Sequence, residues 1–246
     1  MAKGMVRRTL RDAGESVREL GWSNGCLYLF SRVLEKGTCG RVKLYKYYFV
    51  AQPVNLDTRT TQAGGRGLSV IKADFSHPIV RRFPRPPEVI EQRFRDGAIC
   101  FVVLRGEEFG GFLWLQEGQY REDEVRCIYR PLPSDLAVWD YDVYVEPRFR
   151  LTRCFTRLWE AAHAYLRAKG YRWTMSRISG FNRQSLLSHE RLGATFLGSG
   201  IFLTIAGLQL ALLTTRPFFH LSLSPSSAPE LRFRGSPDTP VPSSTL

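Results

Sequence analysis

The stretch 139–194 constrains the fold of this chain most, because it predicts a strand, a basic turn, a long helix, a second strand and a short helix in succession. Apolar residues recur at helical spacing in the long helix, and Gly170 stops it. The predicted elements are Ala137–Val145, Leu151–Lys169, Trp173–Ile178 and Asn182–Leu192. A strand joined by a helix to a second strand predicts a βαβ unit.

The segments on either side add antiparallel pairs to this unit. A strand is expected at Gly67–Ala73, and Ala98–Leu104 should pair with Phe109–Gln116 as a hairpin. Phe196–Leu213 reads as two buried strands joined by a bend at Ala206-Gly207, because its polar and glycine residues argue against a membrane span. The predicted fold class is mixed α/β, with a mostly antiparallel central sheet flanked by helices.

The chain divides by composition into three regions. Residues 1–60 are expected to be a partly helical extension, 61–213 the main domain, and 214–246 a disordered tail rich in proline and serine. Val6, Leu10, Val17 and Leu20 can share one face of a basic amphipathic helix. That helix either packs on the main domain or docks on a membrane surface, and the sequence leaves both open.

Charge and cysteine content restrict partners and location. The net charge of +12 predicts an anionic partner: a phosphorylated cofactor, an acidic carrier protein, nucleic acid or anionic lipid. Nucleic acid is disfavoured, since no zinc-finger spacing or RNP-like sequence is present. The five cysteines form no CxxC, which argues against a zinc site or a disulfide framework. With a charged N-terminus that lacks an apolar signal segment, the expected location is cytoplasmic.

The turn Glu146–Cys154 is the first candidate for a functional site. Unpaired N–H groups and the positive end of the helix dipole lie where a strand runs into a helix, so a phosphate can be held there. The turn and the first helical residues carry Arg148, Arg150, Arg153 and Arg157. Arginines at a helix start oppose the dipole unless an anion lies among them. The alternative is a solvated basic face.

Two carboxylates on the preceding strand form the second candidate. Alternation places Asp140 and Asp142 on the same face, where each would raise the pKa of the other and make one a general base near neutral pH. The alternative is that both pair with neighbouring arginines.

At this point the residues resemble the GCN5-related N-acetyltransferases (GNAT). The matching motifs are Val145-Glu-Pro-Arg-Phe-Arg150, Asn182-Arg-Gln-Ser185 and Glu190-Arg-Leu-Gly193, in the family's order of strand, helix, strand and helix. The resemblance implies an acyl-CoA N-acyltransferase fold whose R-x-x-G-x-G/A turn grips the pyrophosphate of acetyl-CoA. The residues it places against acetyl-CoA or another acyl-CoA are Tyr144, Val145, Arg150, Leu151, Thr152, Arg153, Cys154, Phe155, Asn182 and Ser185.

The sequence departs from the family pattern at four positions. Arg153 and Phe155 stand where the family has glycines that let the backbone approach the pyrophosphate. His189 takes the place of the tyrosine that protonates the departing thiolate, and Ala194 replaces a phenylalanine. A histidine can donate a proton near neutral pH, and the alternative is a helix-surface histidine without a role.

The chemistry implied by the resemblance is transfer of an acetyl or longer acyl group to an amine by direct attack on the thioester. No metal and no covalent enzyme intermediate are expected, so Cys154 is not a nucleophile. Asp142 is the preferred base, followed by Asp140, and Glu91 would line the acceptor side. The amine acceptor stays unidentified, and acyl carrier protein is an alternative donor. The other interpretation is a catalytically weakened module that binds acyl-CoA or an acidic partner such as acyl carrier protein.

Overall fold

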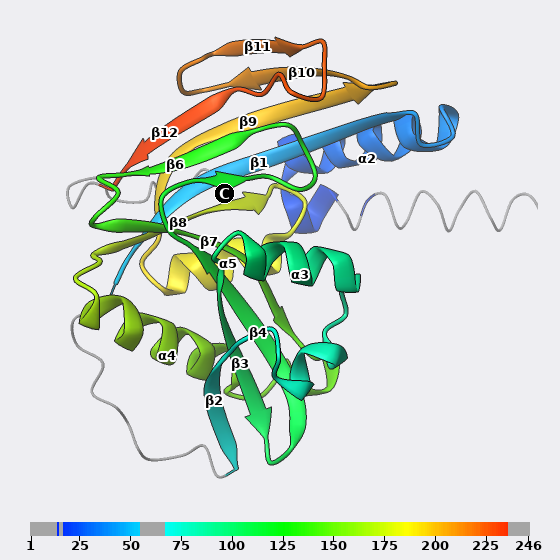
Figure 1. Ribbon diagram of the computed structural model, residues 1–246. Helices are drawn as coiled ribbons and strands as arrows, with labels where there is room; N and C mark the ends of the chain where they lie inside the picture. Colours follow the sequence, from blue (N-terminus) through cyan, green and yellow to red (C-terminus); the bar gives the residue numbers. More distant parts are fainter. Residues whose placement is uncertain (1–13, 15–16, 55–66, 236–246) are drawn as a thin grey trace, which may run out of the picture. The chain divides into compact units, whose positions relative to one another are not determined.

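A computed structural model describes residues 14, 17–54 and 67–235 of the chain, and Figure 1 shows its elements. The chain forms two compact units. The first unit comprises Met1–Gln52, Arg121–Tyr129 and Arg177–Leu246, and the second comprises Pro53–Tyr120 and Arg130–Ser176. Strand β8 (Trp173–Ser179) runs from the second unit into the first.

The second unit contains a mostly antiparallel sheet with the strand order β8-β7-β4-β3-β2. Only the pair of β7 with β8 is parallel, as the predicted βαβ unit requires. The elements of this unit, apart from β8, are β2 (Leu68–Ala73), η1 (Pro78–Arg82), α3 (Pro87–Arg95), β3 (Ile99–Arg105), β4 (Glu108–Gln116), β7 (Ala137–Val145), η2 (Pro147–Phe149) and α4 (Cys154–Ala168). The predicted hairpin is therefore confirmed as β3 and β4.

Helices cover both faces of this sheet. On one face Phe112 and Trp114 of β4 meet Phe83, which follows η1, and Phe94 of α3. Residues that alternate with these point to the other face, where Phe101 contacts Tyr165 of α4 with 5.6 Å between ring centroids. The buried face of α4 carries Leu158, Trp159, Ala162 and Leu166. A mixed α/β unit with a mostly antiparallel sheet between helices is the predicted fold class.

The first unit holds a second antiparallel array, in the order β11-β10-β9-β1. Ala206 and Gly207 have φ angles of 45° and 89° and form the turn between β9 and β10, as the sequence predicts. The elements are α2 (Trp22–Gly37), β1 (Val42–Pro53), α5 (Arg183–Arg191), β9 (Thr195–Ile205), β10 (Leu208–Leu213), β11 (Phe219–Ser222) and β12 (Glu230–Arg234). A further three-stranded sheet has the order β12-β6-β5, with β5 at Tyr120–Arg121 and β6 at Ile128–Leu132.

Both ends of the chain contribute more structure than composition predicts. Within the expected extension 1–60, β1 is a twelve-residue strand that pairs with β9. Within the expected disordered tail, β11 pairs with β10, and Phe233 of β12 lies 4.9 Å from the ring of Phe49. Proline and serine between these strands conceal their alternation of apolar and polar residues. The prediction of a tail disordered from 214 onward is therefore wrong for the strands β11 and β12.

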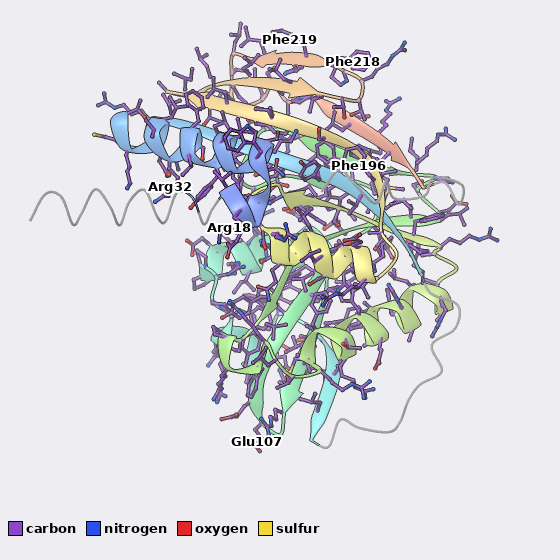
Figure 2. All side chains as sticks on the ribbon, turned by 180° about the vertical axis from the view of Figure 1, so that it is seen from behind. Arg18, Arg32, Glu107, Phe196, Phe218 and Phe219 are labelled. Atoms are coloured by element: carbon purple, nitrogen blue, oxygen red, sulfur yellow. The ribbon has the colours of Figure 1, made fainter. Side chains whose placement is uncertain are left out.

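The outer hairpin of the first unit leaves apolar side chains exposed. Leu212 pairs with Phe219 across β10 and β11, and their side chains are 48% and 59% exposed. Phe218 is 61% exposed, and Figure 2 shows both phenylalanines projecting outward beside β11. In the described part of the chain, no helix combines the length and the apolar character needed to cross a membrane. Val6 and Leu10 of the expected amphipathic helix lie outside the described residues.

Candidate functional site

A β-bulge interrupts β7 at Asp142. Tyr144 pairs with Phe112 and Tyr141 pairs with Trp114, so β7 has one more residue than β4 between these pairs. Asp142 has a φ of 47°, in the left-handed region that aspartate tolerates better than most residues. The simple alternation predicted for this strand is therefore wrong, because the extra residue changes the direction of the side chains that follow it.

Two arginines hold the Asp142 carboxylate. Arg85 donates from both Nε, at 2.9 Å, and Nη2, and Arg93 of α3 donates from Nη1. The side chain of Asp142 is 14% exposed. The guanidinium of Arg93 lies 5.0 Å from the centre of the Tyr141 ring, and that of Arg85 lies 5.7 Å from the Tyr144 ring. Asp142 is the preferred base of the sequence prediction. Its contacts instead match the alternative interpretation, in which it pairs with neighbouring arginines.

Asp140 occupies a different environment from Asp142. Its side chain belongs to a residue that is 2% exposed, and burial raises the pKa of this carboxyl to about 7, while the Thr174 and Ser176 hydroxyls of β8 partly oppose the shift. The raised pKa was predicted, but repulsion by Asp142 does not cause it. The two carboxylates have different partners and do not form a dyad.

Beyond the bulge, one edge of β7 turns away from β4. Glu146 N donates to Gly110 O at 2.9 Å, and the regular alternation of an antiparallel ladder then directs the N–H and C=O of Val145 toward the opposite edge. On that edge, the pairing with β8 runs from Ala137 to Trp139 only. Val145 O contacts Arg150 Nε at 3.5 Å. An extended ligand could therefore add to this edge as a strand would.

The predicted turn connects this edge to the start of α4. The short helix η2 follows β7 directly, and Phe149 N donates to Glu146 O at 2.8 Å. Helix α4 begins at Cys154, with Arg153 as its N-cap residue and no hydrogen bond from the cap side chain. The first N–H groups of a helix have no acceptor within the helix and face the positive end of its dipole. The turn thus has the backbone arrangement predicted for holding an anion.

Most arginines of the turn already have carboxylate partners. Glu160 of α4 lies 2.8 Å from Arg157 and 3.6 Å from Arg153, and Arg148 lies 3.3 Å from Glu108. Glu160 thus supplies part of the anion that the helix start was predicted to need. Arg150 is exposed, and the described residues provide no carboxylate partner for it. Arg150 is therefore the turn arginine most available to a phosphate.

The remaining predicted residues of the turn divide between surface and core. Leu151 is fully exposed, and Thr152 Oγ1 donates to Phe149 O at 2.6 Å. Cys154 is buried, and the Phe155 ring packs against Trp159 with 6.3 Å between centroids. Phe155 replaces a glycine of the family pattern, and its ring contacts the apolar face of α4.

The first unit contains the other predicted site residues, which are Asn182, Ser185 and His189. Asn182 Oδ1 caps α5 by accepting from Ser185 N at 3.0 Å. His189 is 5% exposed, and burial lowers the pKa of its imidazole to about 4. The ring is therefore neutral near pH 7, which does not support the predicted role as a proton donor to a thiolate. Burial on the inner face of α5 explains the difference.

The arginine pair at the bulge was missed by sequence reasoning. Arg85 and Arg93 are two among 35 lysines and arginines, and nothing in their spacing marks them. Glu91, predicted to line the acceptor side, pairs instead with Arg95 at 2.7 Å on an exposed part of α3. Among the residues described, no group of three histidine, cysteine or carboxylate side chains is arranged to hold a metal ion.

Comparison with known proteins gives distant likenesses. No protein-family model matches the sequence, and no curated protein matches it. Among solved structures, the chain is similar to a functionally unknown conserved protein from Staphylococcus epidermidis, with a TM-score of 0.47 and 11% identity over 70% of this chain. The match covers 66% of that protein, so the chain spans just under two thirds of its length.

Two further similar structures are acetyltransferase-type proteins. One is a tandem GNAT protein from the clavulanic acid biosynthesis pathway, with a TM-score of 0.44 and 11% identity over 67% of this chain and 54% of that one. The other is AAC(6')-Iy in complex with the bisubstrate analogue CoA-S-monomethyl-acetylneamine, with a TM-score of 0.39 and 22% identity over 51% of this chain and 89% of that one. GNAT proteins, the family that the sequence resembles, are thus among the similar structures.

Proposed function

We propose that the chain is an N-acyltransferase that moves an acetyl or longer acyl group from acyl-CoA to an amine. The observation that carries this proposal is the outward edge of β7 at Val145, which leads within nine residues to the N-terminus of α4. Pantetheine, which has two amides, would bind along the edge as an added strand. The pyrophosphate would then lie at the turn, against Arg150 and the first N–H groups of α4.

The reaction is a direct displacement at the thioester. The amine nitrogen forms a bond to the carbonyl carbon, and the carbonyl oxygen gains negative charge in the tetrahedral intermediate. The outward N–H of Val145 is the proposed donor to that oxygen. The C–S bond then breaks, the acyl group remains on nitrogen, and CoA leaves as a thiolate that takes a proton to become the free thiol.

We assign the proton lost by the amine to solvent water. Asp142 is held by two arginines, Asp140 is buried, and His189 is neutral, so none of the three predicted residues suits this transfer. The rate at low amine concentration should then rise with pH following the pKa of the amine itself. A profile governed instead by an enzyme group near pH 7 would contradict this assignment.

A binding experiment and a thiol assay test the function together. Acetyl-CoA and longer acyl-CoAs should raise the melting temperature by mass action, and mixed amines should then release free CoA thiol. Arg150→Gln should weaken the thermal shift, while Arg148→Gln, at an exposed ion pair of the same turn, serves as the matched control. Absence of any shift with every donor would rule out the function.

A second candidate function has support of its own. Arg153 and Arg157 are engaged by Glu160, and the expected turn glycines are absent, which favours a module that binds acyl-CoA or acyl carrier protein without turnover. The net charge of +12 favours an acidic carrier. A thermal shift with acyl-CoA or acylated carrier protein, without thiol release at any amine concentration, would establish this alternative over the first.

A further inference from the structure

Two arginines at the β7 bulge surround one carboxylate. Arg85 and Arg93 both pair with Asp142. The charges that act on the neighbouring Tyr144 include Glu146, Arg150 and Arg85, and burial followed by Glu146 raises the pKa of its phenol. Guanidinium groups thus lie close to this part of β7.

Arg85 retains donors for a second anion. Its Nε and Nη2 donate to Asp142, and its Nη1 donates to Pro84 O at 2.7 Å. A guanidinium has five N–H donors, so two of them have no acceptor among the residues that the structure describes. The side chain is 31% exposed, whereas that of Arg93 is 11% exposed. A ligand at the bulge would thus meet Arg85 first.

Aromatic rings fix the orientation of this guanidinium. The Arg85 carbon Cζ lies 5.5 Å from the centre of the Phe112 ring and 5.7 Å from that of Tyr144. Cation–π contacts and the two-point bond to Asp142 together keep the fork in one place at small entropic cost on binding. Tyr144 directly precedes Val145, so the fork lies beside the strand segment to which the acyl donor is assigned.

We propose that Arg85 binds a carboxylate of the acyl acceptor, so that the acceptor is an amine that also carries a carboxylate, as free amino acids do. This inference rests on the proposed acyltransferase function and adds its substrate class. Planar, two-point recognition of a carboxylate is what an oriented guanidinium does best. A cationic group at the same position would instead be repelled by the guanidinium of Arg85.

The test compares amines that differ only in the carboxylate. Phenylalanine with phenethylamine, and leucine with isopentylamine, are supplied as acceptors with acetyl-CoA or a longer acyl-CoA, and thiol release is expressed per concentration of unprotonated amine. We expect kcat/KM to be roughly ten- to hundredfold higher for the amino acid of at least one pair, as for a charge-assisted two-point hydrogen bond.

Variants of Arg85 separate recognition from a merely structural role. Arg85→Gln should remove the preference for the amino acid over the amine that lacks the carboxylate. It should lower kcat/KM for the amino acid and leave kcat/KM for the decarboxylated amine within about threefold of the wild-type value. Arg85→Lys should retain only part of the preference. Arg81→Gln, at an exposed arginine of η1, is the matched control and should change neither. Melting temperatures of all variants report whether the fold persists.

The outcomes distinguish a failure of carboxylate recognition by Arg85 from a failure of the acyltransferase function itself. Equal turnover of both members of each pair, or equal losses for both in Arg85→Gln, would overturn carboxylate recognition while leaving acyl transfer intact. If acyl-CoA raises the melting temperature but none of the amines causes release of free thiol, the acyltransferase function is refuted, and the inference with it. A preference that Arg85→Gln abolishes supports both.

Discussion

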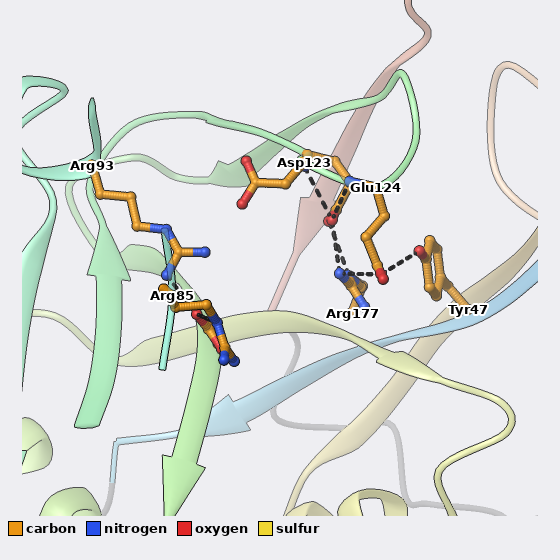
Figure 3. A network of polar contacts seen from close by, with 8 residues as sticks. Tyr47, Arg85, Arg93, Asp123, Glu124 and Arg177 are labelled. Atoms are coloured by element: carbon orange, nitrogen blue, oxygen red, sulfur yellow. Dashed lines mark hydrogen bonds and ion pairs between the residues drawn. The ribbon is translucent and has the colours of Figure 1, made fainter. Parts of the chain in front are cut away.

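Two ion-pair clusters of this protein have opposite arrangements of charge. At the β7 bulge one carboxylate, Asp142, lies between two guanidinium groups. In the first unit one guanidinium, Arg177, lies between the carboxylates of Glu122 and Glu124, at 2.7 Å from each. Both clusters are drawn in Figure 3.

In the cluster around Arg177, called the closed cluster, the charged groups bond to one another and to neighbouring residues. Glu122 has a fully buried side chain, takes a two-point bond from Arg177, and accepts from the backbone N–H groups of Asp123 and Glu124 at 3.2 and 3.3 Å. Tyr47 Oη donates to Glu124 at 2.8 Å, and its ring lies 4.4 Å below the guanidinium. Both carboxylates thus accept hydrogen bonds from within the cluster, and the arrangement serves the packing of β1 and β8 residues.

The cluster around Asp142 differs in its backbone and in its spare donors. It lies at a strained backbone position, and Arg85 keeps N–H donors for a ligand. A network built around a fully buried carboxylate is expected to serve stability, whereas spare donors at a backbone irregularity are expected to serve binding.

The largest effect on stability should come from breaking the closed cluster. Arg177→Met leaves Glu122 buried without its counter-charge, so the free energy of unfolding should fall by about 3–5 kcal/mol. Urea denaturation measures the loss. Glu124→Gln is the control, because that side chain is 49% exposed and its removal should cost less than about 1 kcal/mol. Equal losses in the two variants would contradict the distinction.

Asp140 is a buried carboxyl to which no guanidinium of the described residues is bonded, and its ionisation makes stability depend on pH. The pKa of Asp140 is about 7 in the folded protein, above the value near 4 of an unfolded aspartate. Between these values the folded state keeps a proton that the unfolded state releases, so stability falls as pH rises from about 4 to about 7 and then levels off. The contribution amounts to at most about 4 kcal/mol.

Asp140→Asn isolates this contribution. The variant lacks the titration, so the free energy of unfolding of the wild type minus that of the variant should decline between pH 4 and 7. Two buried histidines, His163 and His189, have pKa values lowered to about 4 and act in the opposite direction, but they cancel in this difference. A flat difference profile would show that Asp140 ionises as in the unfolded chain.

Substitution of Asp142 should have an intermediate effect that depends on the backbone. Asp142→Ala removes the carboxylate that both guanidinium groups contact, and it leaves a Cβ in the left-handed conformation without the polar side chain that makes aspartate tolerant of it, at a cost of about 1–3 kcal/mol. Asp142→Gly loses the same ion pairs but relaxes the backbone, so it should be about 1 kcal/mol more stable than the alanine variant. Chemical unfolding of the pair tests this, and the reverse order would refute backbone strain at the bulge.

The smallest effect is expected at the exposed pair of Arg148 and Glu108. Their side chains are 58% and 54% exposed, and the charges lie 3.3 Å apart. Arg148→Gln should change the free energy of unfolding by less than about 0.5 kcal/mol at physiological salt, because solvent and ions screen the pair. A larger loss would show that the turn depends on this contact for its conformation.

Periodicity was sufficient to predict most of the second unit. The hairpin of β3 and β4, the helix α4 and the parallel neighbours β7 and β8 all follow from alternation, helical spacing and stop signals. The strand β1 was not predicted, because five apolar or aromatic residues in a row hide the alternation that its pairing with β9 reveals. Composition concealed β11 and β12 in the same way.

The sequence predicted the elements around the candidate site but not the contacts of its residues. The turn at Arg150 lies between β7 and α4, as the sequence predicts. A bulge in this strand is implied by the family resemblance, but its position at Asp142 does not follow from the residues, because one added residue changes no local composition yet redirects the chain. Arg85 lies 57 residues before Asp142 in the chain, and Glu160 lies about two helical turns after Arg153, so only the folded backbone brings these partners together.

The left-handed backbone at Asp142 also limits how this position can vary in evolution. Glycine, asparagine and aspartate tolerate such a φ, and of these only aspartate carries a charge. A single residue, Asp142, thus meets two structural requirements: it allows the strand to bend, and it is the counter-ion of two arginines. In relatives that keep the bend with glycine or asparagine, the arginines equivalent to Arg85 and Arg93 should be lost together, so that three positions change as a set.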